Sequence, residues 1–366
     1  MGLLDNFRKK KHNESGLLEL ELDDDLASEP SILDEFLEKD PYEAQRDQLT
    51  PSGLYPHEIL LLDYAPSFFT DETEFPVFWR TQVGLLDMPR LLADLVDRGF
   101  LTEASIDATL ESATVQILKG ALKKSGLPVG GKKQELIARL RTSLSESELY
   151  ALFPRRTFAL TWNGIRALDE AMYIPYIGRN PVERLTIWDI HRKVKKAPEK
   201  SYRDLIWEHL EGRSAVHHGV RDYPAYRACR YRMYQFLMEE NKLKRAFPYL
   251  AEVMYFDLSG AESTADPLHR YVSEKYFFPY DKSIVKLTAG NVQAMRRLQT
   301  DLNLSEEMLK ALLMQFFGQF AISVHLFTPE ECVAIILLEL RGDTERLRQV
   351  YAIAEKRFGE QHSHLV

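Results

Sequence analysis

Apolar residues recur along most of this chain at the three- and four-residue spacing of one helical face. The spacing predicts helices over residues 88–98, 201–211, 226–239, 243–256 and 305–317. Thr328-Pro329-Glu330-Glu331 is a strong start signal, because it combines a capping threonine, a proline in the first turn and an acid at the third helical position. The helix that it opens, 332–340, is apolar nearly all round and is expected at the centre of the C-terminal core. A last helix, 344–358, completes a mainly α-helical fold.

Two of these helices resemble a tetratricopeptide hairpin. They turn around Asn241, and the second places small Ala246 before Phe247, Leu250 and Val253, as the second helix of that repeat does. One such hairpin is not a repeat array. The pattern therefore predicts an all-α helical-hairpin domain over residues 181–366 and no more.

Two short extended pieces, Phe100-Leu101 and the FALT of residues 158–161, interrupt the helical pattern. The first follows a helix that stops at Gly99, and the second leads through a capping Thr161 into another helix. This order resembles the second half of a winged-helix domain, in which the two pieces would pair as strands of the wing. The segment between them is then an insertion in a winged-helix-like carrier. The alternative is a helical spacer on either side.

The chain is thus expected to contain five segments. They are an acidic tail at 1–48, a first carrier half at 49–111, a basic module at 112–145, a second carrier half at 146–180 and the helical domain at 181–366. The tail is poor in aromatic residues and is predicted to be disordered. Pro51, Pro56, Pro66 and Pro76 predict irregular structure at the start of the first carrier half.

The formal net charge of −8 is unevenly distributed. Residues 1–48 hold six basic and fourteen acidic residues, which alone give −8, so the other 41 basic and 41 acidic residues balance. Between Thr114 and Leu144, seven basic residues meet a single acid, Glu135, for a local charge of +6. A protein that coats nucleic acid would be basic throughout, whereas this distribution indicates one local anion site.

The basic module is predicted to form two short helices, 115–124 and 132–144, with Leu127 packed between them. Gly126 suits the left-handed position after the first helix. Lys132 and Lys133 stand where the dipole of the second helix disfavours cations and favours anions. With a glycine turn that lets backbone approach closely and free N–H groups at the helix start, they predict a phosphate site. A solvated charged face is the alternative.

The pattern L-K-x-x-L-K-x-x-G-L-P-x-x-G-x-K-x-x-L-I-x-R-L of residues 118–140 resembles the SAP motif, a helix–extended–helix DNA-binding module. The resemblance covers about a tenth of the chain and implies weak tethering to duplex DNA, A/T-rich or structured. The candidate DNA-binding residues are Lys119, Lys123, Lys124, Gly130, Gly131, Lys132, Lys133 and Arg139. Some SAP modules bind RNA or protein instead. The flanking RRTFALTWNG and YIPYIGR segments resemble SAP-containing proteins of Gram-positive bacteria, from which no activity carries over.

The strength of such a contact follows from its charge. Neutralising three or four phosphates gives a slope of log affinity against log salt of about −3, which supports only micromolar or weaker binding. Useful occupancy then needs a second contact. The carrier is one source, and the basic run HRKVKKAPEK at 191–200 is another, although that run also fits an exposed linker.

No catalytic or metal-binding constellation stands out. Adjacent His217 and His218, near Asp222, are the best candidates, but neighbours on a helix point about 100° apart and do not easily face one ion. The common phosphate-loop, dinucleotide, nucleophile-elbow and zinc-protease motifs are absent. We therefore expect no catalytic residue, cofactor or metal, with an enzyme built around these histidines as a minor alternative.

The two cysteines, Cys229 and Cys332, are too few for a disulfide framework, and no apolar run has the length of a membrane span. We expect a cytoplasmic, non-catalytic protein that the basic module tethers to duplex DNA and whose helical domain binds a protein partner. The alternative is an interaction scaffold whose basic module recognises acidic protein surfaces. The acidic tail would then compete with DNA for Lys132 and Lys133.

Overall fold

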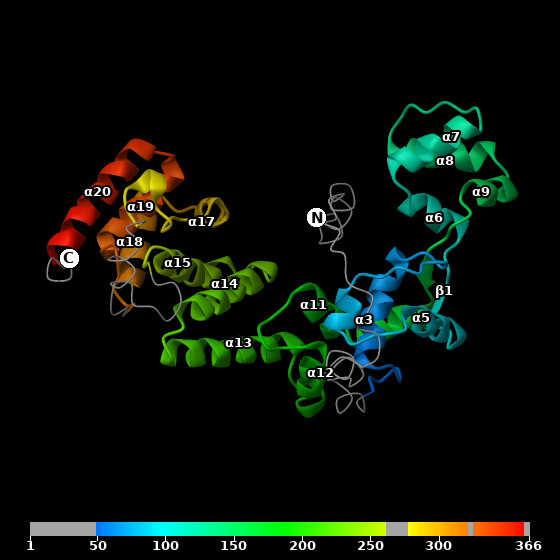
Figure 1. Ribbon diagram of the computed structural model, residues 1–366, viewed down its shortest axis with the longest axis horizontal. Coiled ribbons are helices and arrows are strands. Elements are labelled where there is room, and N and C mark those ends of the chain that lie inside the picture. The colour runs from blue at the N-terminus through cyan, green and yellow to red at the C-terminus, as the bar shows by residue number, and fades with distance from the viewer. Residues whose placement is uncertain (1–48, 261–276, 321–324, 362–366) are drawn as a thin grey trace, which may run out of the picture. The chain divides into compact units, whose positions relative to one another are not determined.

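The computed structural model describes residues 49–260, 277–320 and 325–361 (Figure 1). The tail at 1–48, expected to be disordered, lies outside these residues. The described chain is mainly helical, as predicted, with two strands in one small sheet. None of the helices in the described ranges combines the length and apolarity of a membrane span. The chain divides into two compact units, with the boundary between Glu199 and Lys200.

The first unit is built from short elements. Its helices are α3 (Pro56–Tyr64), η2 (Ala65–Ser67), α4 (Phe78–Thr81), α5 (Met88–Asp97), α6 (Ile106–Ser112), α7 (Val115–Lys124), α8 (Lys133–Ser143), α9 (Glu146–Leu152), α10 (Trp162–Glu170), α11 (Tyr173–Arg179) and α12 (Ile187–Lys196). Its strands are β1 (Leu101–Glu103) and β2 (Phe158–Leu160).

Helix α3 is the centre of this unit. Its residues 59–62, Ile-Leu-Leu-Leu, are each no more than 1% exposed, and α5, α10, α11 and α12 all pack on it. The prolines had predicted irregular structure here. Instead Pro56 begins the helix, because a proline in the first turn loses no helical hydrogen bond and its fixed φ suits the helix.

The two extended pieces pair as expected. Strands β1 and β2 are antiparallel with Leu101 opposite Leu160, and α6–α9 form an insertion between them. Thr161 caps α10 by accepting from the amide of Gly164 at 3.2 Å, and its hydroxyl donates to the carbonyl of Gly99 at 2.7 Å. A Cβ on Gly164 would lie 2.3 Å from the carbonyl oxygen of Phe100, so only glycine lets the helix lie this close. The winged-helix character of the carrier stays a prediction.

Helix α12 belongs to the first unit together with α11, although the sequence assigned residues from 181 onward to the helical domain. They stay with it because both pack on α3. The basic run 191–200 is not simply a linker, since its first six residues are the last turns of α12. His191 is only 1% exposed, and its Nδ1 lies 2.8 Å from the hydroxyl of Tyr173.

The second unit is helical throughout its described part. Its elements are α13 (Tyr202–Gly219), α14 (Tyr223–Glu239), α15 (Leu243–Asp257), η3 (Tyr280–Lys282), α17 (Ala289–Asp301), α18 (Glu306–Phe317), α19 (Pro329–Arg341) and α20 (Thr344–Gln361). The helices predicted from apolar spacing are all present, several of them longer by a turn or less and α13 by two turns.

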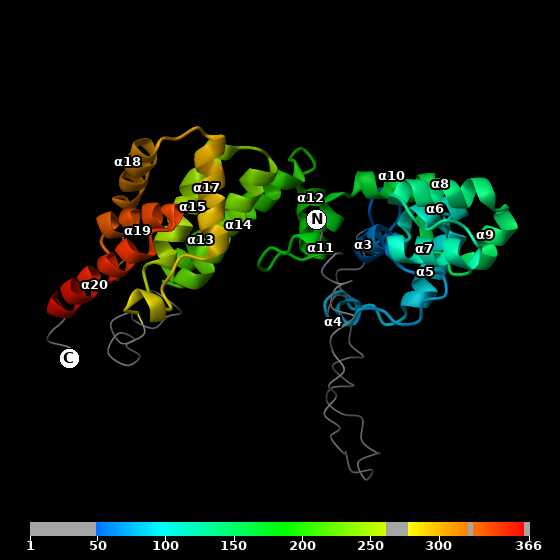
Figure 2. The same cartoon turned by 90° about the horizontal axis from the view of Figure 1, so that it is seen from above.

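The start and position of α19 are as predicted. Thr328 accepts a hydrogen bond from the amide of Glu331 at 3.2 Å, and Pro329 occupies the first turn. Cys332 and Ile336 are fully buried, and the helix packs on α17, α18 and α20. Figure 2 shows α19 and α20 side by side, as does Figure 1.

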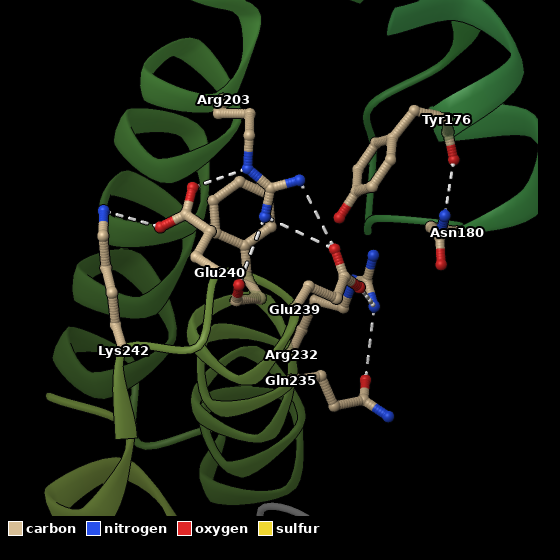
Figure 3. Close-up of polar contacts among 9 residues, drawn as sticks. Tyr176, Asn180, Arg203, Arg232, Gln235, Glu239, Glu240 and Lys242 are labelled. Carbon is tan, nitrogen blue, oxygen red and sulfur yellow. Dashed lines mark hydrogen bonds and ion pairs between the residues drawn. The ribbon is translucent and has the colours of Figure 1, made fainter. Parts of the chain in front are cut away.

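Helices α13, α14 and α15 pack in sequence order. Asn241 takes a positive φ of 53° in the turn between α14 and α15. Figure 3 shows how Arg203 fastens this group: it donates to Glu240 at 2.6 Å and to the carbonyl of Phe236 at 3.2 Å, and it pairs with Glu239 at 3.4 Å. The network ties the start of α13 to the end of α14. The tetratricopeptide likeness of the hairpin stays a prediction.

Candidate nucleic-acid interface

The basic segment folds as part of a four-helix module, α6–α9, that spans residues 106–153. Its buried core is formed by Ile106, Leu110, Ala113, Leu118, Ala121, Leu122, Leu136, Ile137, Leu140, Leu149 and Phe153, with half-buried Leu127 against it. The sequence had limited the module to 112–145. Helices α6 and α9 extend it because the central helix pair alone offers too small a core to be stable.

Helix α7 ends as the sequence predicts. Gly126 has a φ of +68°, and the amide of Leu127 donates to the carbonyl of Leu122 at 2.9 Å, which closes the helix end. Lys123 and Lys124 lie in the last turn, where cations complement the negative end of the helix dipole. These two lysines therefore have a local structural role beside any role in binding.

Helix α8 begins differently from its neighbours in the module. Ser105, Thr114 and Ser145 cap α6, α7 and α9, and each accepts a hydrogen bond from an amide in the first turn. The N-cap of α8 is Lys132, whose ammonium group has no acceptor to offer. Glu135 compensates in part, since its carboxylate accepts from the amide of Lys132 at 3.1 Å.

The glycine pair before α8 divides into two roles. Gly131 has a φ of +125°, and a Cβ there would lie 2.4 Å from a carboxylate oxygen of Glu135. Gly131 is thus required by the backbone turn and by the acid that caps the helix. At Gly130 a Cβ would meet nothing within 4 Å, and its φ is ordinary. The turn needs one glycine and leaves the second without a structural reason.

Three of the seven basic side chains hold the module together. Arg139 donates through Nη1 to the carbonyls of Pro128 and Gly130, and so braces the turn. Lys133 donates through Nζ to the carbonyl of Glu111 at 2.6 Å. Arg141 pairs with Asp107 at 2.6 Å and with Glu111 at 3.6 Å. These contacts join α8 to α6 and to the turn.

The other four basic residues form what we call the lysine quartet: Lys119, Lys123, Lys124 and Lys132. All four are exposed, and within the described residues none of their ammonium groups makes an ion pair or hydrogen bond. The module as a whole is less basic than its centre. Over 106–153 the seven cations face five acids, Asp107, Glu111, Glu135, Glu146 and Glu148, for a net charge of +2.

The histidine pair does not converge on one point. His217 is 6% exposed, with Nδ1 3.6 Å from the carboxylate of Asp222, whereas His218 is exposed and lies 5.2 Å from the ring of Tyr226, centroid to centroid. The two rings thus occupy different surroundings, as expected for neighbours on one helix. Cys229 is buried within α14.

Comparison with protein families supports the sequence motif. Residues 109–145 match the model of the SAP domain, so the chain contains a SAP domain within the α6–α9 module. No curated protein matches the chain.

Proposed function

We propose that the SAP domain attaches this protein, without catalysis, to the phosphate backbone of duplex DNA through the lysine quartet. The observation that carries the proposal is that these four lysines are exposed and unengaged among the described residues, while the other three cations of the module are occupied. Lysine is a flexible point charge, which suits contacts to phosphate that carry no base information. The second unit would hold a protein partner.

The charge of the module limits the affinity. Three or four phosphate contacts give a salt slope of about −3, and the acids of α6 and α9 reduce the long-range attraction. Binding by the SAP domain alone is therefore expected to be micromolar or weaker at physiological salt. A second contact, from the carrier or from a bound partner, would raise the occupancy.

The test is fluorescence anisotropy of the full chain with a labelled A/T-rich duplex across a salt series. Replacing all four quartet lysines by glutamine should abolish saturable binding at every salt concentration. A control with the same charge change carries Lys244→Gln, Lys310→Gln, Arg346→Gln and Lys356→Gln, all at exposed positions of the second unit. This control should keep the slope near −3. Equal binding by both variants, or no saturable binding by the wild type, would reject the proposal.

Recognition of an acidic protein surface is the second candidate. It is favoured by exposed apolar residues on the same helix as three of the lysines, since Ile117 is 53% and Val115 40% exposed. Apolar contacts strengthen protein interfaces and add little to a phosphate contact. Ile117→Ser separates the two functions: DNA affinity should stay unchanged, whereas an acidic protein partner should be lost.

A further inference from the structure

An open surface pocket of about 390 Å³ lies on the second unit between α13 and α14, and it is called the cavity below. It is lined by Glu211, Ser214, Ala215, His218 and Gly219 of α13 and by Tyr226 and Arg230 of α14. The α13 residues recur at three- and four-residue spacing and so share one helical face. Small side chains in the middle of that face leave the space. This volume can hold a small molecule, and because the pocket is open, part of that molecule would remain in solvent.

Arg230 is held in a fixed orientation at this cavity. Its Nε lies 2.9 Å from a carboxylate oxygen of Glu252 and 3.0 Å from the hydroxyl of Tyr226. Its guanidinium carbon lies 5.1 Å from the ring centroids of both Tyr226 and Tyr249. Such a guanidinium has already lost its side-chain freedom, so a ligand that binds it pays little further ordering entropy.

The outer edge of Arg230 is unoccupied among the described residues. Nη1 has only the sulfur of Met233 at 3.6 Å, a weak acceptor, and no described residue accepts from Nη2. Arg203 of the same unit is the contrast, because acceptors surround its Nε, Nη1 and Nη2 (Figure 3). A guanidinium with its Nε edge anchored and its two Nη groups open presents a fork to a planar carboxylate.

Behind Arg230 the chain buries an acid. Glu252 is 5% exposed, and its carboxylate also accepts from the hydroxyl of Tyr226. Burial raises the pKa of Glu252, which the neighbouring Arg230 partly offsets. Ion pairs of this kind are weak stabilisers, because apolar replacements are often as stable. Their other use is to position charged groups at a site.

The cavity carries both signs of charge. Glu211 of α13 and Arg230 of α14 both line it. The indole N–H of Trp207 donates to Oε1 of Glu211 at 2.7 Å, which orients the carboxylate. With Glu211 and Glu252 nearby, a dianion such as phosphate would be repelled. A ligand with one negative and one positive group meets a partner at each.

We propose that this cavity binds a small zwitterion of the α-amino acid class, with its carboxylate on the Nη groups of Arg230 and its ammonium group on Glu211. The hydroxyl of Ser214, on the same face of α13, offers a further donor to the carboxylate. The site lies within the second unit and is independent of the SAP domain.

The first experiment titrates the full chain with each of the twenty L-amino acids at up to 20 mM and follows thermal unfolding and calorimetric heat. At least one should raise the Tm of the second unit by roughly 3–6 °C at ten times its Kd. The amide of that amino acid, which lacks the carboxylate, and its N-acetyl form, which lacks the ammonium group, should not. The proposal is overturned if no amino acid binds, or if the amide binds as well as the free acid.

Variants then locate the site. Glu211→Gln, at an exposed position, should weaken the ligand at least tenfold, whereas the matched control Glu208→Gln, one turn earlier on α13, should leave Kd unchanged. Arg230→Lys keeps a cation beside Glu252, removes the fork and should also weaken binding tenfold. Far-UV circular dichroism checks the fold of each variant. Unchanged affinity in Glu211→Gln would place the ligand elsewhere, whatever Arg230→Lys does.

Discussion

The α6–α9 module and the helices α13–α15 both carry many cations, but the surroundings of these cations differ. In the module, four lysines project from exposed helix faces without a partner in the described residues. In α13–α15, Arg203, Arg227 and Arg230 lie between helices, each on a carboxylate of a later element. The Arg227 and Asp257 side chains, for example, are 29% and 13% exposed. The quartet lysines of the module thus face solvent, whereas these three arginines of the second unit join helices.

The difference follows residue type more than region. Both arginines of the module, Arg139 and Arg141, are also engaged internally, and of its five lysines only Lys133 is. Arginine is weakly hydrated and has five donors in a plane, so it tolerates partial burial and saturates several acceptors. Lysine is strongly hydrated and stays in water. Within the module, the four quartet lysines therefore mark the surface offered to an anion, and the two arginines mark internal contacts.

Arg227→Met is expected to give the largest effect, and it tests whether arginines between the helices stabilise the second unit. Arg227 binds Asp257 through Nε at 2.7 Å and Nη2 at 3.0 Å. The substitution leaves a largely buried carboxylate whose remaining side-chain donor, among the described residues, is the amide of Asn291. We expect the unfolding free energy of the second unit to fall by about 2–3 kcal/mol, somewhat below the loss for a fully buried pair. Urea denaturation measures it. The exposed control Lys310→Met should change the unfolding free energy by less than about 0.5 kcal/mol. If the two substitutions had equal effects, Arg227 would not stabilise the packing of these helices.

A second test uses pH and separates the two regions. Burial removes His325 from water and lowers its pKa to about 4. Its Nδ1 accepts from the amide of Phe327 at 3.1 Å, and its Nε2 lies 3.0 Å from the carbonyl of Tyr255. Since the folded pKa lies below the usual 6.5, the stability from this group is present above pH 6.5 and is lost as the pH falls through 4.

The unfolding free energy of the second unit should therefore fall by roughly 2 kcal/mol more in the wild type than in His325→Gln between pH 6.5 and 4. Thermal unfolding at several pH values measures the difference. The module has no buried histidine in its described residues, so its own transition should be the same in both proteins. A wild type and variant with parallel pH profiles would mean that His325 is not held in its neutral form.

Local signals account for what could be predicted from the sequence. Thr328 and Thr161 are capping residues that act within three positions, and both caps form as expected. The apolar spacing of helices and the motif at 118–140 are likewise local, and they suffice for the helical fold and the SAP domain. The pairing of Leu101 with Leu160 could not be predicted from local signals alone. It was predicted from the order of the elements, which resembles that of a winged-helix domain.

Pairings over long sequence distances were not predictable. Nothing near Arg141 indicates that Asp107, 34 residues earlier, will neutralise it, and so the local charge of +6 overstated the cationic surface. Glu252 and Tyr226 are likewise 26 residues apart, and their contact behind Arg230 depends on how α14 and α15 pack. The sequence states how many charges there are, but tertiary packing decides which of them remain available.

The smallest expected effect tests whether ion pairs within the module reduce its affinity for DNA. Asp107→Asn with Glu111→Gln releases Arg141 and raises the net charge of the module from +2 to +4. We expect DNA affinity to rise about threefold to tenfold at 50 mM salt and the salt slope to steepen by about 1. The pair is exposed, so the stability of the module should fall by no more than about 1 kcal/mol.

Glu355→Gln with Glu360→Gln makes the same charge change on α20 and should leave the affinity as it is. Adding Arg141→Gln to the first variant should restore the wild-type slope, because the released guanidinium is then gone. If the affinity rises equally in both double variants, net charge alone governs the encounter. The availability of individual lysine and arginine side chains in the module would then not determine DNA affinity.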